Sequence, residues 1–257
     1  MTASLLTEIP VGLSALVILP ISRDFLPEEI SNIENFMNKG GSILILTESQ
    51  KNAQNLNSLL SKQGITVGKN VIIEEQIKQG KIGNLVLQPL VKDYGEHAIT
   101  AGFNKEIILS TANTVNTNNT KKVYELGFTS PLSWADSDLE SIFSDKPQAA
   151  FNEDGDIKGP LSIAVAKESE SNNRLVVIGD SDFVNNINIR SLFNRDFFLN
   201  SLNWVIGQKQ GISIRAATIS GSKKLIPEKS LKIMYLLTGL ILPEIILLLG
   251  FISYRKE

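Results

Sequence analysis

An apolar run near the carboxyl terminus limits what this chain can fold into more than any other feature of its sequence. Residues 233–252 read IMYLLTGLILPEIILLLGFI, and their sole charged residue is Glu244. A helix of about 20 residues rises 1.5 Å per residue and so matches the roughly 30 Å hydrocarbon core of a bilayer. The run therefore predicts a transmembrane helix over residues 231–254, followed by a basic tail over residues 255–257. It also predicts a single-pass protein of the cell (cytoplasmic) membrane.

Two residues inside the run, Pro243 and Glu244, predict a contact within the membrane. Proline removes one backbone hydrogen bond and kinks a helix, and neighbouring helices commonly compensate for that loss. A carboxyl group near the bilayer midplane costs at least ~2.5 kcal/mol, so it usually faces a partner. We therefore expect both residues to contact another membrane helix; the simpler alternative is that Glu244 is tolerated without a role. A buried core helix is also apolar all round, but such helices usually run about 10–14 residues.

Composition excludes several classes of function. The chain has 257 residues, a formal net charge of −2 and no cysteine. A balanced charge without a basic stripe gives no electrostatic footprint for nucleic acid. The lack of cysteine excludes disulfides, thiol nucleophiles and cysteine-ligated metal. Neither a G-x-x-x-x-G-K-[ST] phosphate loop nor a G-x-G-x-x-G dinucleotide motif occurs. We therefore expect no cofactor and no ATP hydrolysis by a P-loop mechanism.

Strand and helix patterns alternate ahead of the apolar run. Short apolar runs predict buried strands, and amphipathic stretches with polar or proline starts predict helices. The predicted strands lie at residues 15–19, 42–46, 71–73, 84–89, 107–109, 123–128, 161–166 and 174–178. The predicted helices begin at residue 27, span residues 52–63, and run from an N-cap at Asn194 through residue 205. This rhythm predicts an α/β domain over residues 1–207 with an open, doubly wound, mostly parallel sheet. Polar residues near 136–158 suggest a subdivision of this domain, and residues 208–230 indicate a polar stalk.

The most site-like stretch is Gly179-Asp180-Ser181-Asp182-Phe183, directly after the predicted strand at residues 174–178. Open α/β sheets bind ligands in the loops beyond the carboxyl ends of their strands. We therefore predict a binding edge formed by polar side chains of this loop, namely Asp180, Ser181, Asp182, Asn185 and Asn186.

Three other interpretations of this loop stay open. It partly resembles the G-x-S-x-G elbow of serine hydrolases, but Phe183 replaces the second glycine, and the only histidine, His97, precedes the serine. Its oxygen ligands could hold a cation, but their spacing does not match the D-x-[DN]-x-[DN]-G pattern, so we predict no metal site. The third interpretation is that these side chains only cap the following turn.

The order of several segments resembles the GldG-like family, which comprises auxiliary subunits of ABC-type transport systems first named for bacterial gliding motility. The segments that carry the resemblance over nearly the whole chain are LVILP, PEEI, NKGGSILIL, HAITAGF, KGPLSIAVA, RLVVIGDSDFVNN, NRDFFLNSLNWVIG, GISIR and LPEIILLLG. The resemblance implies a fold similar to class I glutamine amidotransferases, whose cysteine chemistry cannot apply to this chain. It also implies a soluble domain on the outer, periplasmic side of the membrane, whereas the lysines before the apolar run favour the cytoplasm.

These observations predict a non-enzymatic, membrane-anchored accessory subunit that binds a substrate or a partner. The resemblance implies that its partners are an ABC permease and a separate ATPase subunit, and the ligand is an envelope component or a small molecule. Two alternatives remain: a membrane-anchored α/β hydrolase acting on cell-envelope material, and a purely structural scaffold.

Overall fold

The computed structural model divides the chain into two compact units, Met1–Ile214 and Arg215–Glu257. It describes residues 9–10, 12–20, 22–51, 53–78, 81–118, 122–145, 149–169, 173–207, 235–244, 247 and 255, without the side chains of residues 76–78 and 81–84. Each unit is considered by itself below.

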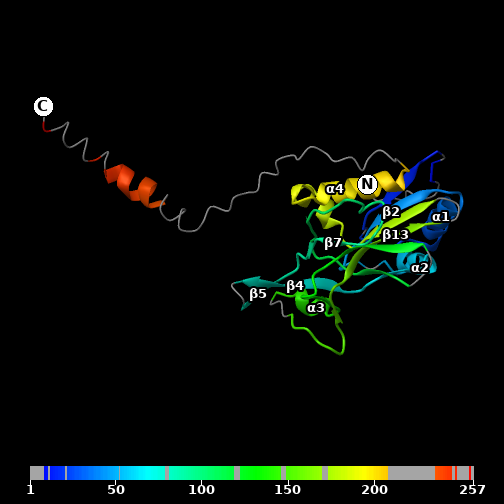
Figure 1. Ribbon diagram of the computed structural model, residues 1–257, viewed down its shortest axis with the longest axis horizontal. Helices are drawn as coiled ribbons and strands as arrows, with labels where there is room; N and C mark the ends of the chain where they lie inside the picture. Colours follow the sequence, from blue (N-terminus) through cyan, green and yellow to red (C-terminus); the bar gives the residue numbers. More distant parts are fainter. Residues whose placement is uncertain are drawn as a thin grey trace. The chain divides into compact units, whose positions relative to one another are not determined.

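A six-stranded sheet forms the centre of the first unit (Figure 1). Its strands run in the order β1 (Ala15–Ile18), β2 (Ser42–Leu46), β14 (Arg174–Ile178), β13 (Ser162–Glu168), β10 (Val123–Phe128) and β7 (Asp93–Tyr94). The first three strands are mutually parallel, and β13, β10 and β7 each pair antiparallel to the strand before them in this order. All residues of β2 are buried, as expected for a strand covered on both faces.

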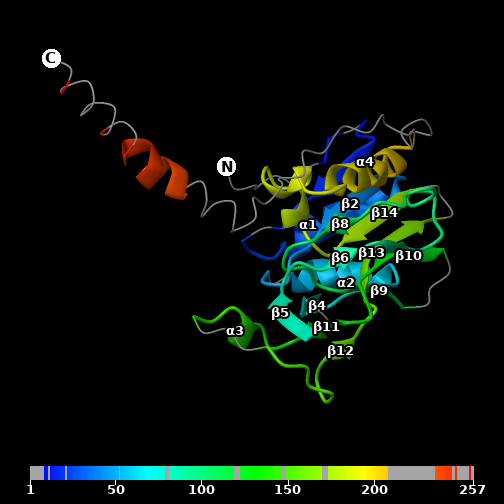
Figure 2. The ribbon, with the colours of Figure 1, turned by 60° about the vertical axis from the view of Figure 1, so that its left-hand side comes forward.

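Helices cover both faces of this sheet (Figures 1 and 2). The helices α1 (Pro27–Asn38) and α2 (Gln54–Lys62) pack on one face, against alternate residues of β2 and β14. The helix α4 (Asn194–Val205) packs on the other face against the intervening residues. Successive side chains of a strand point to opposite faces of the sheet, so each central strand contributes alternate residues to two apolar cores.

A second, antiparallel sheet lies beside the central one (Figure 2). It contains β12 (Ile157–Lys158), β11 (Ser133–Asp136), β4 (Val71–Lys78) and β5 (Lys81–Val86), and the short helix α3 (Leu139–Ile142) packs with it around Trp134. The remaining short elements are the pairs β3 (Ile65–Val67) with β9 (Val115–Thr117) and β6 (Leu90–Val91) with β8 (Ile107–Ile108), and the 3₁₀ turns η1 (Asp182–Val184) and η2 (Asn188–Arg190).

The prediction of a mostly parallel, doubly wound sheet is wrong. Among the described strands, only the pairs β1–β2 and β2–β14 are parallel, and the other sheets are antiparallel throughout. Residues 169–173 alone connect β13 to β14, and a parallel connection needs a crossover of a dozen or more residues. The strand predicted at residues 71–73 also leaves the central sheet and becomes the start of β4 in the second one.

Several local predictions are confirmed. The predicted bounds of β2 and β14 match the observed ones, α1 begins at Pro27 as predicted, and α4 ends at Val205 as predicted. Asn194 does not cap α4, because the residue at the N-cap is Phe193. The Asn194 amide instead bonds to the backbone of Ile108, Phe183 and Asn188.

The prediction of a transmembrane helix over residues 231–254 is contradicted. Within the described part of the chain, no helix combines the length and the apolar character needed to cross a bilayer. Residues Leu237–Ile241 form a π-helical turn (η3), in which the Leu242 N–H bonds to the Leu237 carbonyl. Pro243 follows at once, and its ring clashes with the carbonyl four residues earlier, so a wider turn at this position has a steric cause.

The predicted localisation depended on that helix. A single-pass protein of the cell membrane, with its domain on the outer side, is therefore not supported. Pro243 and Glu244 are both exposed within the second unit, and their contact with a partner remains a prediction. The predicted stalk over residues 208–230 lies outside the described residues, as does the tail over residues 255–257 apart from Arg255.

Substitution of Gly179 by alanine should destabilise the first unit. A Cβ atom at Gly179 would lie 2.1 Å from the backbone oxygen of Asn113, which itself bonds through its N–H to the Gly179 carbonyl at 2.8 Å. Overpacking of this kind costs about 1–3 kcal/mol. We expect urea denaturation to show a loss of this size for Gly179→Ala and little change for the control Gly155→Ala, where the nearest atom lies 3.8 Å away. Equal losses in the two variants would contradict the close approach.

Candidate functional site

The candidate site lies where two neighbouring parallel strands send their connections to opposite faces of the sheet. The strand β2 leads to α2 on one face, and its neighbour β14 leads to α4 on the other. Leu46 and Ile178 are paired at the carboxyl ends of these strands. Such a point leaves a crevice between the two outgoing loops, and open α/β sheets bind ligands there.

A cavity of about 360 Å³ opens at this end of the sheet. Its walls come from the carboxyl ends of β1 and β2, the start of α2 and the turns after β3 and before β9. Its polar lining includes the side chains of Arg23, Asp24, Glu48, Lys51, Lys69 and Asn113.

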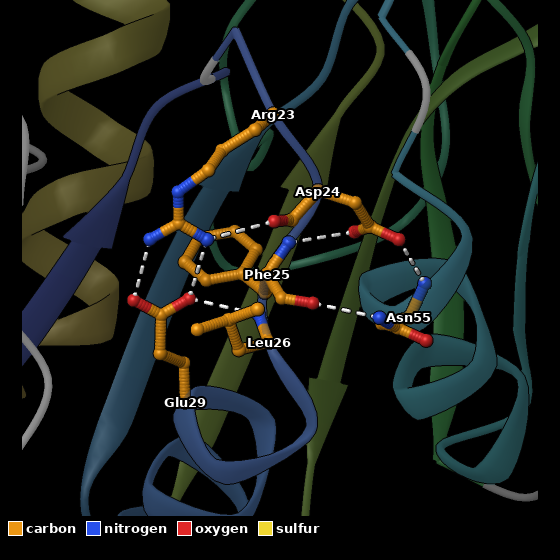
Figure 3. Close-up of polar contacts among 6 residues, drawn as sticks. All are labelled: Arg23, Asp24, Phe25, Leu26, Glu29 and Asn55. Atoms are coloured by element: carbon orange, nitrogen blue, oxygen red, sulfur yellow. Dashed lines mark hydrogen bonds and ion pairs between the residues drawn. The ribbon is translucent and has the colours of Figure 1, made fainter. Parts of the chain in front are cut away.

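A network of hydrogen bonds fixes one wall of the cavity (Figure 3). The Arg23 guanidinium pairs with both carboxylate oxygens of Glu29, at 2.9 and 3.0 Å, and one of these oxygens also accepts the Leu26 N–H. The Asp24 carboxylate accepts the backbone N–H groups of Phe25 and Asn55, each at 2.8 Å. These bonds join the segment before α1 to the first turn of α2.

The same wall affects the charge state of Glu29. The Arg23 guanidinium lowers the pKa of the Glu29 carboxyl, and the Leu26 N–H adds to this effect against the opposing effect of burial. Glu29 is therefore an anion that neutralises Arg23 beside the cavity.

One hydrogen bond crosses between the two outgoing loops. The Ser181 hydroxyl donates to the Glu48 carboxylate with an oxygen–oxygen distance of 2.7 Å. Glu48 follows β2 and Ser181 follows β14, so this bond links the cavity to the loop predicted from the sequence. The bond orients the half-buried Glu48 side chain at the cavity wall.

Asn113 and Ser49 add polar groups to the same region. The Thr47 hydroxyl bonds to one end of the Asn113 amide at 2.9 Å. The other end of this amide has no hydrogen-bond partner among the described residues, although Asn113 is only 2% exposed and lines the cavity. The buried Ser49 hydroxyl also has no partner among those residues. Buried polar groups usually have a partner, so the Ser49 hydroxyl is an exception, whereas the Asn113 side-chain nitrogen is not a fully buried atom.

Asp180, the first predicted binding residue, is buried and bonds to backbone groups of the protein itself. Its side chain is buried and accepts the backbone N–H groups of Ser110 at 2.6 Å and Asp182 at 2.7 Å. Burial raises the pKa of Asp180 to about 7, and the N–H donors oppose the rise because they favour the carboxylate. Asp180 thus holds the loop before β9 against the loop after β14.

The other predicted residues lie in the same loop but not around one ligand position. The Asn185 amide oxygen accepts the N–H groups of Ile187 and Asn188, and its nitrogen donates to Asp182 at 3.3 Å. Asn186 is exposed. Of the five predicted residues, Ser181 alone bonds to a side chain that lines the cavity. In the described part of the chain no group of three or more His, Cys, Asp or Glu side chains could hold a metal ion.

The sequence analysis missed Glu48, Lys51, Lys69 and Asn113. A signal for the first two was present, because Thr47-Glu48-Ser49 follows a buried strand just as the predicted loop does. No local pattern indicated Lys69 or Asn113, which reach the cavity through the pairing of β3 with β9.

With this geometry established, comparison with known proteins identifies the family. The family model described as "ABC-type uncharacterized transport system" (ABC_transp_aux) matches residues 2–201. The chain belongs to this family. It is accordingly an auxiliary component of an ABC-type transport system. A comparison with curated proteins gave no match.

One solved structure shares the fold of this ABC-transport component. The structure titled "mmIFT52 N-terminal domain" superposes with a TM-score of 0.57 at 14% identity, over 76% of this chain and 78% of that one. A putative ThuA-like protein from Bacteroides uniformis covers 74% of this chain and 68% of its own, and a beta-galactosidase from Bacillus circulans covers 76% and 22%. Both have a TM-score of 0.38 and 14% identity. At 14% identity the likeness to the mmIFT52 domain concerns the fold alone, and nothing is inferred from the other two structures.

His97 lies away from the cavity. Its ring contacts the Trp204 ring with centroids 4.7 Å apart, and the Arg174 guanidinium lies 4.9 Å from the same Trp204 ring. Arg174 begins β14, whereas Ser181 follows its end, so about 13 Å of strand at 3.3 Å per residue separates the two regions. His97 therefore cannot serve as the base of a Ser181 nucleophile.

The ionisation of His97 can be measured directly. Burial lowers the pKa of His97 from 6.5 to about 4; Arg174 acts in the same direction and Glu168 opposes it. Since the chain has a single histidine, its ring proton resonance is unique in an NMR titration. We expect a midpoint near pH 4. The stabilisation from neutral His97 is complete above about pH 6.5 and is lost as the pH falls through about 4. A midpoint near 6.5 would contradict the burial of the ring.

Asp180 should affect the pH dependence of stability in the sense opposite to His97, and the variant Asp180→Asn tests this. Because the folded-state pKa of Asp180 is about 7 and its ordinary value is 3.8, its contribution is complete below about pH 3.8 and is lost as the pH rises through about 7. We therefore expect the stability of wild type relative to Asp180→Asn to fall by about 1–4 kcal/mol between pH 4 and pH 8. Urea titrations of both proteins at the two pH values measure this difference, and a constant difference would disprove the shift.

Proposed function

We propose that this chain is a GldG-like, non-enzymatic accessory subunit that binds a ligand in the cavity beside Glu48 and docks onto an ABC permease. A separate ATPase subunit would hydrolyse ATP, since this sequence has no P-loop motif. The family match over residues 2–201 is the observation that carries the transport role.

The arrangement around Ser181 supports binding over catalysis. Ser181 donates its proton to Glu48 at 2.7 Å, and the histidine that a serine hydrolase would use lies beyond the other end of β14. A nucleophile also needs donors that stabilise the developing oxyanion. The backbone N–H groups of Asp182, Val184 and Asn185, which follow Ser181 in the chain, already bond within the loop. Glu48 lies within hydrogen-bond reach of Ser181, but the histidine and the nearby N–H donors that a serine hydrolase would use are not available to it, so the cavity suits recognition.

The same bond suggests how a bound ligand would be communicated to a partner. A ligand that competes with Ser181 for the Glu48 carboxylate would weaken the tie between the two outgoing loops. The loop after Ser181 carries Ile187, whose side chain is 82% exposed on a turn held by Asn185. An exposed apolar side chain on a hydrogen-bonded turn is suited to insert into a partner surface. We therefore assign the permease contact to the loop Asp182–Leu192.

Copurification tests this function. The tagged protein, extracted with mild detergent from its native cells, should recover a permease and an ABC ATPase in stoichiometric amounts. Ile187→Ser should reduce the recovery of the permease about tenfold or more, because it removes a central apolar contact. The matched control is Ile157→Ser, an exposed isoleucine of the second sheet that should leave recovery unchanged.

Recovery of neither subunit with the wild-type protein would overturn the accessory-subunit function. An equal loss with Ile187→Ser and Ile157→Ser would retain the function but remove the loop as its docking surface. An α/β hydrolase is the remaining candidate in the first case, and it would lose activity on replacement of Ser181 by alanine.

A further inference from the structure

The charges that line the cavity are not equally available to a ligand. Arg23 is engaged by both carboxylate oxygens of Glu29, and both oxygens of Asp24 accept backbone N–H groups. These two residues therefore complete the wall of the cavity rather than its binding groups. What remains is one anion, Glu48, and two cations, Lys51 and Lys69.

The two lysines are free to bind an anion. Both are exposed, and neither forms an ion pair with any residue that the structure describes. They come from different segments, Lys51 from the turn before α2 and Lys69 from the turn after β3, and they meet only because both line this cavity. Two ammonium groups beside one opening favour a carboxylate or a phosphate.

Glu48 favours a positively charged group of the ligand, whereas the two lysines favour a negatively charged one. Ser181 occupies one of its carboxylate oxygens, so the other oxygen can accept a hydrogen bond from a ligand. A simple anion would be repelled by this carboxylate, and a simple cation would be repelled by the two lysines. A ligand that carries both charges meets neither repulsion.

The neutral lining completes the recognition. The unpartnered end of the Asn113 amide offers a hydrogen bond to a neutral polar group of the ligand. Phe25, Leu56 and Val67 supply an apolar wall for a small side chain. The volume of about 360 Å³ is at the lower end of the range for small-molecule pockets, about 300–1,000 Å³.

We propose that this cavity binds a small zwitterion of the amino acid or dipeptide class. Its ammonium group bonds to Glu48, its carboxylate bonds to Lys51 and Lys69, and its amide or side chain faces Asn113 and the apolar wall. This assignment rests on the proposed function, since it names the ligand of the same site.

Binding to the purified wild-type protein is measured by calorimetry and by thermal unfolding. The probes are alanine, alanyl-alanine, and two derivatives of the dipeptide that each lack one charge, the N-acetylated and the C-amidated forms. We expect alanyl-alanine or alanine to bind saturably and to raise Tm. Each blocked derivative should have an affinity at least about tenfold lower, because one charged contact is lost in each.

Variants assign each charge to its partner. Glu48→Gln retains an acceptor for Ser181 but should remove most of the preference for the free ammonium group over the N-acetylated form. The double variant Lys51→Ala with Lys69→Ala should remove the preference for the free carboxylate over the amide. Lys62→Ala is the control, because Lys62 lies on the surface of α2 outside the cavity and pairs with Glu34. It should bind like wild type.

Two results would overturn the proposal: no saturable binding of any probe, or unchanged preferences in both cavity variants. Preference for alanine over alanyl-alanine would narrow the class to free amino acids, and the reverse order would narrow it to peptides. Copurification of the permease and the ATPase is measured without added ligand. A protein that recovers both subunits yet binds no zwitterion would therefore refute the ligand class alone.

Discussion

The parallel pairing of β2 with β14 is the contact on which the rest of the first unit depends. Both strands are buried over nearly their whole length, with α1 and α2 on one face and α4 on the other. Burial on both faces supplies the largest favourable contribution to folding, at roughly 25 cal/mol per Å² of apolar surface. The pairing also sets Leu46 beside Ile178, so that the loops after these strands begin at neighbouring points. The loop before β9 also approaches the loop after β14 so closely, at Asn113 and Gly179, that no room remains for a side chain at Gly179.

The proposed function depends on this adjacency. A subunit that binds a ligand and signals this to a permease would need two sites that are coupled to each other. In this unit the Glu48–Ser181 bond joins a cavity of mixed charge to a turn that exposes Ile187. The hydrogen bonds of Asn185, Asn188 and Asn194 give that turn a defined shape, which a partner can recognise with little loss of entropy. The similarity of the fold to the mmIFT52 N-terminal domain shows that the same framework exists in another protein, without indicating a shared ligand.

The sequence predicted the loop on one side of the candidate site but not the residues that line the cavity. The rule that ligands bind beyond the carboxyl ends of strands led to the loop Asp180–Asn186, and Ser181 in that loop does bond to the cavity lining. The rule could not rank the residues of the loop, because Asp180 and Asn185 are equally polar but bond to backbone groups of the protein itself. It could not supply Lys69 or Asn113 either, since these come from segments that meet only after β3 pairs with β9.

The local pattern of the sequence determined where strands and helices form, whereas only the tertiary structure decided their directions and neighbours. Apolar runs and helix-start residues were enough for the bounds of β2 and β14 and for the start of α1, because these depend on propensity and on burial within each segment. A buried strand has the same pattern in a parallel and an antiparallel pair, so the direction of β13 depends on its short connection to β14. In the carboxyl-terminal run the hydropathy is set by composition, whereas only the structure shows the π-helical turn at Leu237–Ile241, shortly before Pro243.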